Sequence, residues 1–279
     1  MQADIVPALF GLAAAATWGA GDFCGGLATK RANVYAVVIL GDVVGGLLLS
    51  TLAMVFGEPL PPMEELLWGA VAGLAGAVGL LALYRALALG RMSVASPVAA
   101  IITAALPVVF GAFVEGLPGG WQILGFGFAL VGVWLISGDK TARVHLNELG
   151  LPLVAGLGFG IFFVIIGSVS REVALWPLVA ARAAAVLVLS LFALATRQLQ
   201  LPKFEHLPLV ALVGVLDAGG NAFFALAAQA GRLDVAAVLS SLYPASTVWL
   251  AWLILKERIH RRQFMGIIAA LAAIILITL

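Results

Sequence analysis

The sequence predicts an all-α integral membrane protein in which ten transmembrane helices form two inverted five-helix repeats. Three observations lead to this fold class. Of the 279 residues, 63% are hydrophobic and only 10% are charged, and the mean hydropathy is +1.14. The apolar residues fall into ten long runs, and the second half of the chain matches the first at a fixed offset. Because soluble proteins carry about 25% charged residues, this composition indicates a lipid environment.

Ten apolar runs are long enough to cross the membrane as helices, because about 20 apolar residues span roughly 30 Å of hydrocarbon. Short connections rich in Pro, Gly or charged residues separate them, such as GEPLPPMEE at 57–65 and KERIHRR at 256–262. Connections this short leave no room for a soluble domain. The expected helices occupy residues 5–28, 33–56, 64–88, 93–115, 120–138, 148–169, 174–196, 206–230, 235–255 and 262–279.

Lysine and arginine residues are concentrated in the connections on one side of the membrane. Eleven lie in the connections 1–2, 3–4, 5–6, 7–8 and 9–10, which we call the basic side, whereas only Arg171 and Arg232 lie on the opposite side. Cytoplasmic loops carry an excess of these residues. We therefore expect a multi-pass protein of the inner (cytoplasmic) membrane, with the basic side in the cytoplasm and both termini outside.

An internal repeat appears when the chain is shifted against itself by 141 residues. Gly73 then aligns with Gly214 and Gly79 with Gly220, and LGRMSVA aligns with AGRLDVA. This offset divides the chain into the halves 1–141 and 142–279. Because each half has five helices, the second half must enter the membrane upside down relative to the first. Inverted repeats build transporters whose substrate site lies near the membrane midplane at the repeat interface.

Three motifs on these helices resemble those of EamA-type transporters of the drug/metabolite transporter superfamily: TWGAGD at 17–22, ALxxGRxxVASP at 86–97 and LILKERIHRRQFMGI at 253–267. The resemblance covers essentially the whole chain. It implies a basket of ten helices with a central cavity lined mainly by helices 1–4 and 6–9, while helices 5 and 10 lie at the periphery. It also implies alternating access and the export of small metabolites, amino acids or drugs.

Five ionisable residues lie inside the expected membrane helices, where a charge is costly and each is therefore a candidate for function. If every base pairs with an acid, one carboxylate remains unpaired, and in an apolar site it is stabilised as the neutral acid and can carry a proton. Two structural alternatives remain open: Arg85 can extend to the cytoplasmic interface, and Arg182 with Asp217 can be an ion pair that only joins two helices. The five residues are Asp22, Asp42, Arg85, Arg182 and Asp217.

Polar and aromatic residues near these charges are further candidates for substrate binding or proton coupling. Trp18 lies on the same helix face as Asp22, because the two are four residues apart. The 141-residue offset places an aromatic residue at the matching position of the second half. Packing is the open alternative for each aromatic side chain. The candidates are Trp18, Tyr84, Phe159, Asn221 and Tyr243.

Two prolines within expected helices are hinge candidates. Pro97 lies early in the fourth helix and Pro244 lies near the middle of the ninth. A proline inside a helix removes a backbone hydrogen bond and kinks the helix. The carbonyl groups freed at such a kink can line a cavity, and the kink can act as a hinge. Alternatively, the kink only accommodates the packing of the helix against its neighbours.

Together these features favour a secondary transporter, namely an exporter of small polar metabolites such as amino acids, with the proton as candidate coupling ion. Buried acids with aromatic rings equally suit efflux of multiple drugs or lipophilic cations. The alternative from another class is an intramembrane enzyme acting on a lipid-linked substrate, but the three histidines are scattered among connections and helix ends. We therefore expect no enzyme, no cofactor and no metal site.

The expected partners are a small-molecule substrate and the lipid bilayer. The net charge of +1 argues against a nucleic-acid partner. No GxxxxGK[ST] motif for nucleotide binding occurs in the sequence. The oligomeric state is left open.

Overall fold

The structure, a computed structural model, describes residues 5–88, 92–137, 149–169, 173–256 and 260–278. Within these ranges the chain forms helices and no β-strand. The first half contributes α1 (Ile5–Thr29), α2 (Val34–Val55), α3 (Met63–Ala88), α4 (Met92–Val114) and α5 (Gly120–Ser137). The second half contributes α6 (Gly150–Val169), α7 (Leu175–Ala195), η2 (Phe204–His206), α8 (Leu207–Ala230), α9 (Leu233–Ser240), α10 (Tyr243–Leu255) and α11 (Arg261–Thr278).

These helices account for the ten expected membrane crossings. Eight spans within the described ranges are long and apolar enough to cross a membrane. Shorter apolar stretches, Val98–Val114 in α4 and Gly120–Ile136 in α5, provide the other two. The expected fold class, an all-α integral membrane protein with two inverted five-helix repeats, is confirmed.

The ninth crossing is interrupted, whereas the sequence predicted one helix over 235–255. It consists of α9 and α10, separated by a turn at Ser241 and Leu242. Pro244 is the second residue of α10, and without an N–H it cannot donate to the carbonyl of Ser240, four residues earlier. The helix therefore ends before the proline and starts again at Tyr243. Pro97, by contrast, lies within α4, whose backbone is helical from Met92 to Val114.

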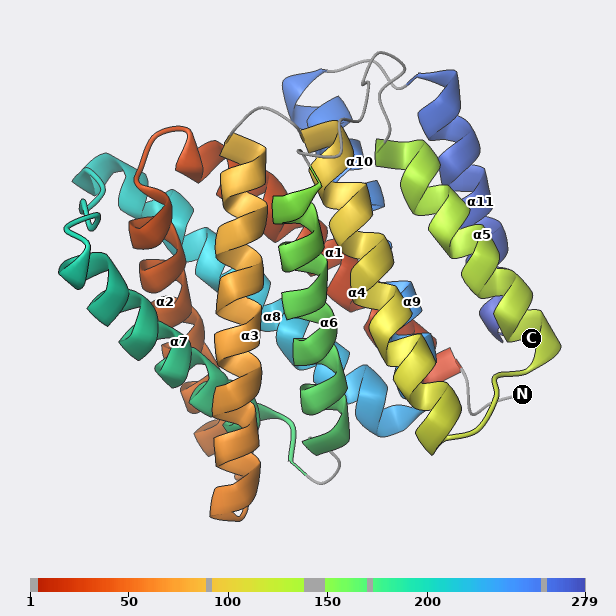
Figure 1. Ribbon diagram of the computed structural model, residues 1–279, viewed down its shortest axis with the longest axis horizontal. Coiled ribbons are helices and arrows are strands. Elements are labelled where there is room, and N and C mark those ends of the chain that lie inside the picture. Colours follow the sequence, from red (N-terminus) through yellow and green to blue (C-terminus); the bar gives the residue numbers. More distant parts are fainter. Residues whose placement is uncertain (1–4, 89–91, 138–148, 170–172, 257–259, 279) are drawn as a thin grey trace.

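The two halves pack against each other through pairs of helices that the repeat relates, and Figure 1 shows their arrangement in the bundle. Helix α1 packs against α8, and its counterpart in the second half, α6, packs against α3. Helix α2 packs against its own counterpart α7, and α5 packs against α11. The α5–α11 pair lies at one edge of the bundle in Figure 1 and the α2–α7 pair at the other. The helices between these two pairs enclose the centre of the protein.

Glycines allow helices of different halves to approach closely near this centre. A Cβ atom on Gly214 in α8 would collide with the backbone of Gly41 in α2, and one on Gly73 in α3 would collide with the backbone of Ala181 in α7. Gly73 and Gly214 are the same position in the two repeats. The repeat therefore preserves glycine at the point where each of these helices contacts a helix of the other half.

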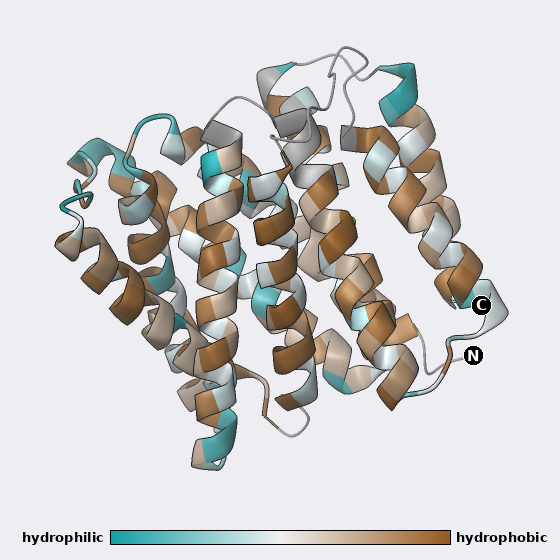
Figure 2. Ribbon diagram, viewed as in Figure 1, coloured by the Kyte–Doolittle hydropathy of each residue, from teal (hydrophilic) through white to brown (hydrophobic). Residues whose placement is uncertain are grey.

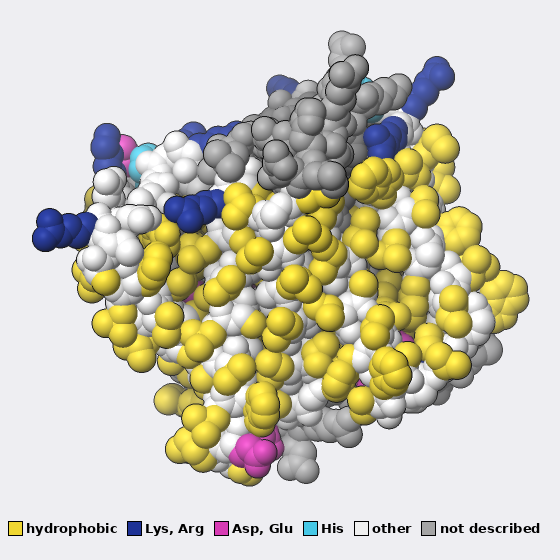
Figure 3. Space-filling model, viewed as in Figure 1, with side chains coloured by type: hydrophobic (Ala, Val, Ile, Leu, Met, Phe, Trp, Pro, Cys, Tyr) yellow, Lys and Arg dark blue, Asp and Glu magenta, His cyan; other side chains and the backbone are white. Residues whose placement is uncertain are grey.

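The surface is arranged as a membrane protein requires. Hydrophobic residues cover the flanks of the helices, and hydrophilic residues gather toward the helix ends (Figure 2). Lysine and arginine side chains gather along the upper edge, which is the basic side (Figure 3). Part of that side lies outside the described residues, as do the expected repeat boundary at 141–142 and the residues Arg91, Lys140, Arg143, Arg171 and Arg258.

Candidate functional site

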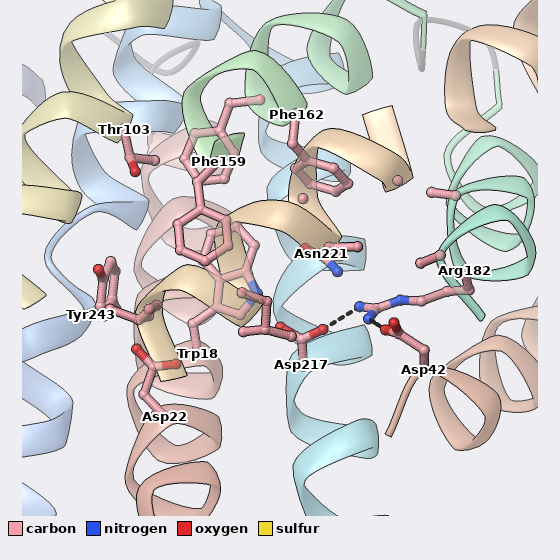
Figure 4. Close-up of a pocket in the computed structure, with 18 residues that line it drawn as sticks. Trp18, Asp22, Asp42, Thr103, Phe159, Phe162, Arg182, Asp217, Asn221 and Tyr243 are labelled. Carbon is pink, nitrogen blue, oxygen red and sulfur yellow. Dashed lines mark hydrogen bonds and ion pairs between the residues drawn. The ribbon is translucent and has the colours of Figure 1, made fainter. Parts of the chain in front are cut away.

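A cavity lies at the interface of the two halves and encloses about 690 Å³ of empty space, part of it open to solvent. Its lining comes from α1–α4 and α6–α8 together with the start of α10 (Figure 4). These are the first four crossings of each half, as the resemblance implied. The structure places eight of the ten candidate residues in this lining: Trp18, Asp22, Asp42, Phe159, Arg182, Asp217, Asn221 and Tyr243.

One side of the cavity contains an ion triad. The two terminal nitrogens of Arg182 donate separately, Nη1 to Asp42 Oδ1 and Nη2 to Asp217 Oδ2 (Figure 4). Arg182 is 8% exposed and Asp42 is 4% exposed, so the triad is largely removed from solvent. Asp42 is a third member beyond the Arg182–Asp217 pair that the sequence suggested. Because Asp42 belongs to α2, the triad also joins the second half to the first.

Asp22 is the cavity carboxylate that has no basic partner within the described ranges. It lines the cavity from α1 and has no hydrogen-bond or ion-pair partner among the residues that the structure describes. Figure 4 shows it below Trp18 and Tyr243, apart from the triad. The described lining therefore contains three carboxylates and one guanidinium group, and two of those carboxylates already bind the guanidinium.

Aromatic side chains form another part of the wall. Trp18 stacks on Phe163 with 5.2 Å between ring centroids. The Trp18 ring also lies against Gly220 in α8, where a Cβ would come within 2.5 Å of the ring. The Phe159 ring lies against Gly79 in α3 in the same way, at 2.9 Å. The 141-residue offset relates both the two rings and the two glycines, so each half supplies one ring that rests on a glycine of the other half.

Two candidate residues lie outside the cavity lining. Tyr84 is 2% exposed, and its ring packs where a Cβ on Gly25 of α1 would otherwise be. Arg85 is exposed in the last turn of α3, toward the basic side. Neighbouring residues on a helix point about 100° apart, so the buried Tyr84 directs Arg85 away from the bundle centre. This placement agrees with the interfacial alternative for Arg85 and separates it from Asp22 and Asp42.

Sequence reasoning missed three notable lining residues, namely Thr103, Phe162 and Phe163. Phe162 and Phe163 follow Phe159 at spacings of three and four, which places all three on one helix face. That spacing was a usable signal. Thr103 is 2% exposed and its hydroxyl lies 3.5 Å from the carbonyl oxygen of Gly156. Nothing in the sequence distinguished Thr103 from other threonines in apolar helices.

The described histidines lie away from the cavity. His206 is in η2, next to Glu205, and His260 precedes α11. His145 lies outside the described residues. Among the described residues, no group of three or more His, Cys, Asp or Glu side chains is arranged to hold a metal ion.

A family model described as "EamA-like transporter family" matches residues 6–138 and again residues 148–279. A solved structure described as "Crystal structure of protein" matches with a TM-score of 0.80 and 17% identity, covering 98% of this chain and 98% of that chain. At that identity the likeness concerns the fold alone. No curated protein matches this chain.

Proposed function

This chain belongs to the EamA-like transporter family, and from that premise we propose that it is a secondary transporter that exports small organic cations by alternating access. The protein is a multi-pass membrane protein, and we place it in the inner membrane with the basic side in the cytoplasm.

The main support is the carboxylate of Asp22, which lines the cavity and has no partner among the residues that the structure describes. A buried charge is stable only when it is paired or neutralised, and the one guanidinium in the described lining is already bound by Asp42 and Asp217. A cationic substrate or a proton satisfies Asp22 without disturbing the triad. An amino acid would also need a base for its carboxylate, and Arg85, the other arginine within an expected membrane helix, is exposed outside the cavity. The described lining thus offers one free carboxylate and no free base, which favours a cationic substrate over a zwitterion.

The aromatic wall supports the same substrate class. The faces of tryptophan and tyrosine rings attract cations, most strongly when water is excluded, and Trp18 lies beside Asp22 in the wall. Asn221 is 7% exposed, lines the cavity and has no hydrogen-bond partner among the described residues. Its amide is available to a polar group of the substrate. We therefore propose a compact amine with an aromatic or apolar body.

Proton coupling follows if the cation and the proton compete for the same carboxylate. Asp22 then releases its proton when the amine binds and takes a proton when the amine leaves. The amine and the proton would occupy the site alternately. Each would neutralise the Asp22 carboxylate while the protein changes between its two orientations. An inward proton gradient would thereby drive the amine outward.

The test uses three probes that share one aromatic body and differ in charge: phenethylamine, phenylalanine and 3-phenylpropionate. The full-length protein in detergent is heated with each probe at the same concentration, because a ligand that binds only the folded state raises the midpoint of unfolding, and a tighter ligand raises it further. We expect phenethylamine to raise the midpoint most, and we expect Asp22→Asn to abolish that rise. The exposed carboxylate of Glu205 provides the control variant Glu205→Gln, which should respond as the wild type does.

Two results would contradict this proposal. Stronger stabilisation by phenylalanine than by phenethylamine would restore the amino-acid alternative. An unchanged response of Asp22→Asn would remove Asp22 from the site. In proteoliposomes, phenethylamine uptake that is independent of an imposed pH gradient in the wild type would exclude proton coupling while leaving the cation site intact.

A further inference from the structure

We infer that Glu58 and Glu115 are gating residues that hold the cavity closed toward the opposite side. Each lies in a connection of the first half and caps the start of a helix of the second half. The inference rests on the alternating access proposed above, but it concerns residues outside the cavity lining.

The first contact joins the α2–α3 connection to α7. Glu58 Oε1 accepts hydrogen bonds from the backbone N–H groups of Leu175 at 2.8 Å and Trp176 at 3.1 Å. The indole nitrogen of Trp176 donates in return to the carbonyl oxygen of Glu58 at 2.9 Å. The first N–H groups of a helix lack partners within the helix, and the N-cap residue of α7, Ala174, provides no side-chain hydrogen bond. A carboxylate from the other half provides the cap instead.

The geometry of the α2–α3 connection places Glu58 for this role. Gly57 has φ +65°, a left-handed conformation that favours glycine. The N–H of Gly57 bonds back to Met54 and that of Glu58 bonds back to Ala53, which is the glycine-terminated helix end known as a Schellman motif. The glutamate therefore starts from a fixed position at the end of α2.

The second contact joins the α4–α5 connection to α9 in the same manner. The two carboxylate oxygens of Glu115 lie 3.4 and 3.3 Å from the backbone nitrogen of Leu233. The N-cap residue of α9 is Arg232, whose side chain makes no capping bond. Arg232 instead donates to the carbonyl oxygen of Gly116 at 2.8 Å and to Asp234 at 2.7 Å. Again a helix start of the second half is held by a connection of the first half.

Both contacts lie on the opposite side of the membrane and lead directly to the cavity. The connections concerned are at the lower end of the bundle in Figure 1. Helix α7 carries Arg182 about two turns beyond its capped start, and α9 leads into Tyr243. If the cavity is to open toward this side, α7 and α9 must separate from the connections of the first half. Both carboxylates must then release their N–H partners in every transport cycle.

Hydrogen bonds of this kind suit a gate. Carboxylates are favourable at helix N-termini, yet both the carboxylate and the free N–H groups are well hydrated once a connection separates from the helix. The contact can therefore form and break without leaving a buried polar group unpaired.

The test measures access to the cavity from each side of the membrane. A single cysteine is introduced as Ala77→Cys, at a small residue of the cavity lining, in a Cys24→Ser background that removes the native thiol. A membrane-impermeant cationic methanethiosulfonate reagent is added to one side or the other of oriented vesicles. We expect Glu58→Ala and Glu115→Ala each to raise the labelling rate from the opposite side by roughly tenfold, the size of effect that the loss of a hydrogen bond to a charged group produces.

Glu64→Ala is the matched control, because Glu64 is an exposed glutamate in the first turn of α3 on the same side. It should leave the labelling rate unchanged. A change confined to one side is the signature of a gate. Equal increases from both sides would show that the glutamates only stabilise the fold, and unchanged rates would show that they do not control access; either result overturns the inference. The labelling needs no substrate, so failure of the phenethylamine test would leave its outcome intact.

Discussion

Replacing Arg182 with methionine removes the shared cation of the triad while retaining much of the length of the side chain. The two carboxylates that it binds, from Asp42 and Asp217, then face each other in an apolar bundle without a counter-charge. Methionine leaves no buried polar group of its own. The change therefore isolates the electrostatic role of the guanidinium.

The magnitude follows from the burial of the three side chains. Removal of one partner from a buried ion pair costs about 3–5 kcal/mol. Asp42 is almost fully buried, whereas the Asp217 side chain is 23% exposed and regains some hydration from the cavity. We therefore expect Arg182→Met to lower the free energy of unfolding by about 3 kcal/mol, at the lower end of that range. The triple variant with Asp42→Asn and Asp217→Asn should recover part of this loss, because the two amides carry no charge that needs a buried counter-charge.

The assay is chemical unfolding in detergent micelles, followed by the loss of helical circular dichroism. Arg85→Met is the matched control, since the same substitution is made at an exposed arginine in the last turn of α3. It should change the free energy of unfolding by less than about 1 kcal/mol. If Arg182→Met lowered the free energy of unfolding by no more than Arg85→Met does, the buried triad would be refuted as a structural element. A triple variant as unstable as Arg182→Met alone would refute it as well.

Two further predictions test the packing and the orientation. Gly220→Ala places a methyl group against the Trp18 ring and should destabilise the protein by about 1–3 kcal/mol in thermal unfolding. Gly219→Ala, whose Cβ would have its nearest neighbour at 3.9 Å, should be tolerated, and equal effects of the two variants would contradict the close contact with the ring. Cysteines introduced into the connection 56–62 should react with an impermeant thiol reagent outside intact cells, whereas those in 197–203 should not. The reverse pattern would show that the charge bias gives the wrong orientation.

Much of the fold was predictable because each membrane crossing is encoded locally. An apolar run of sufficient length must form a helix in lipid, since no water is present to satisfy the backbone. The break at Ser241 and Leu242 was only partly predictable. Pro244 indicated a disturbance, but a kinked helix and an interrupted helix have the same sequence signature.

The site was predictable where a residue is unusual for its surroundings. Asp22, Asp42 and Arg182 stand out in apolar helices, and all three line the cavity. Arg85 was equally unusual in sequence, yet it is exposed at the helix end. A long side chain in the last turn of a helix can reach the interface, and the direction in which it points depends on how the helix is rotated against its neighbours.

The sequence by itself determined the number of crossings, the inverted repeat and the charged residues of the apolar helices that were candidates for the site. Composition and periodicity suffice for these properties, because lipid penalises every unpaired polar group wherever the helix lies. Only the tertiary structure decided which charges meet. Three acids and two bases allow several pairings, and the choice depends on the close contacts of α2 with α7 and α8, made through glycines such as Gly41 and Gly214. Those contacts bring Asp42 and Asp217 to the two terminal nitrogens of Arg182 and leave Asp22 as the cavity carboxylate that has no partner in the described part of the chain.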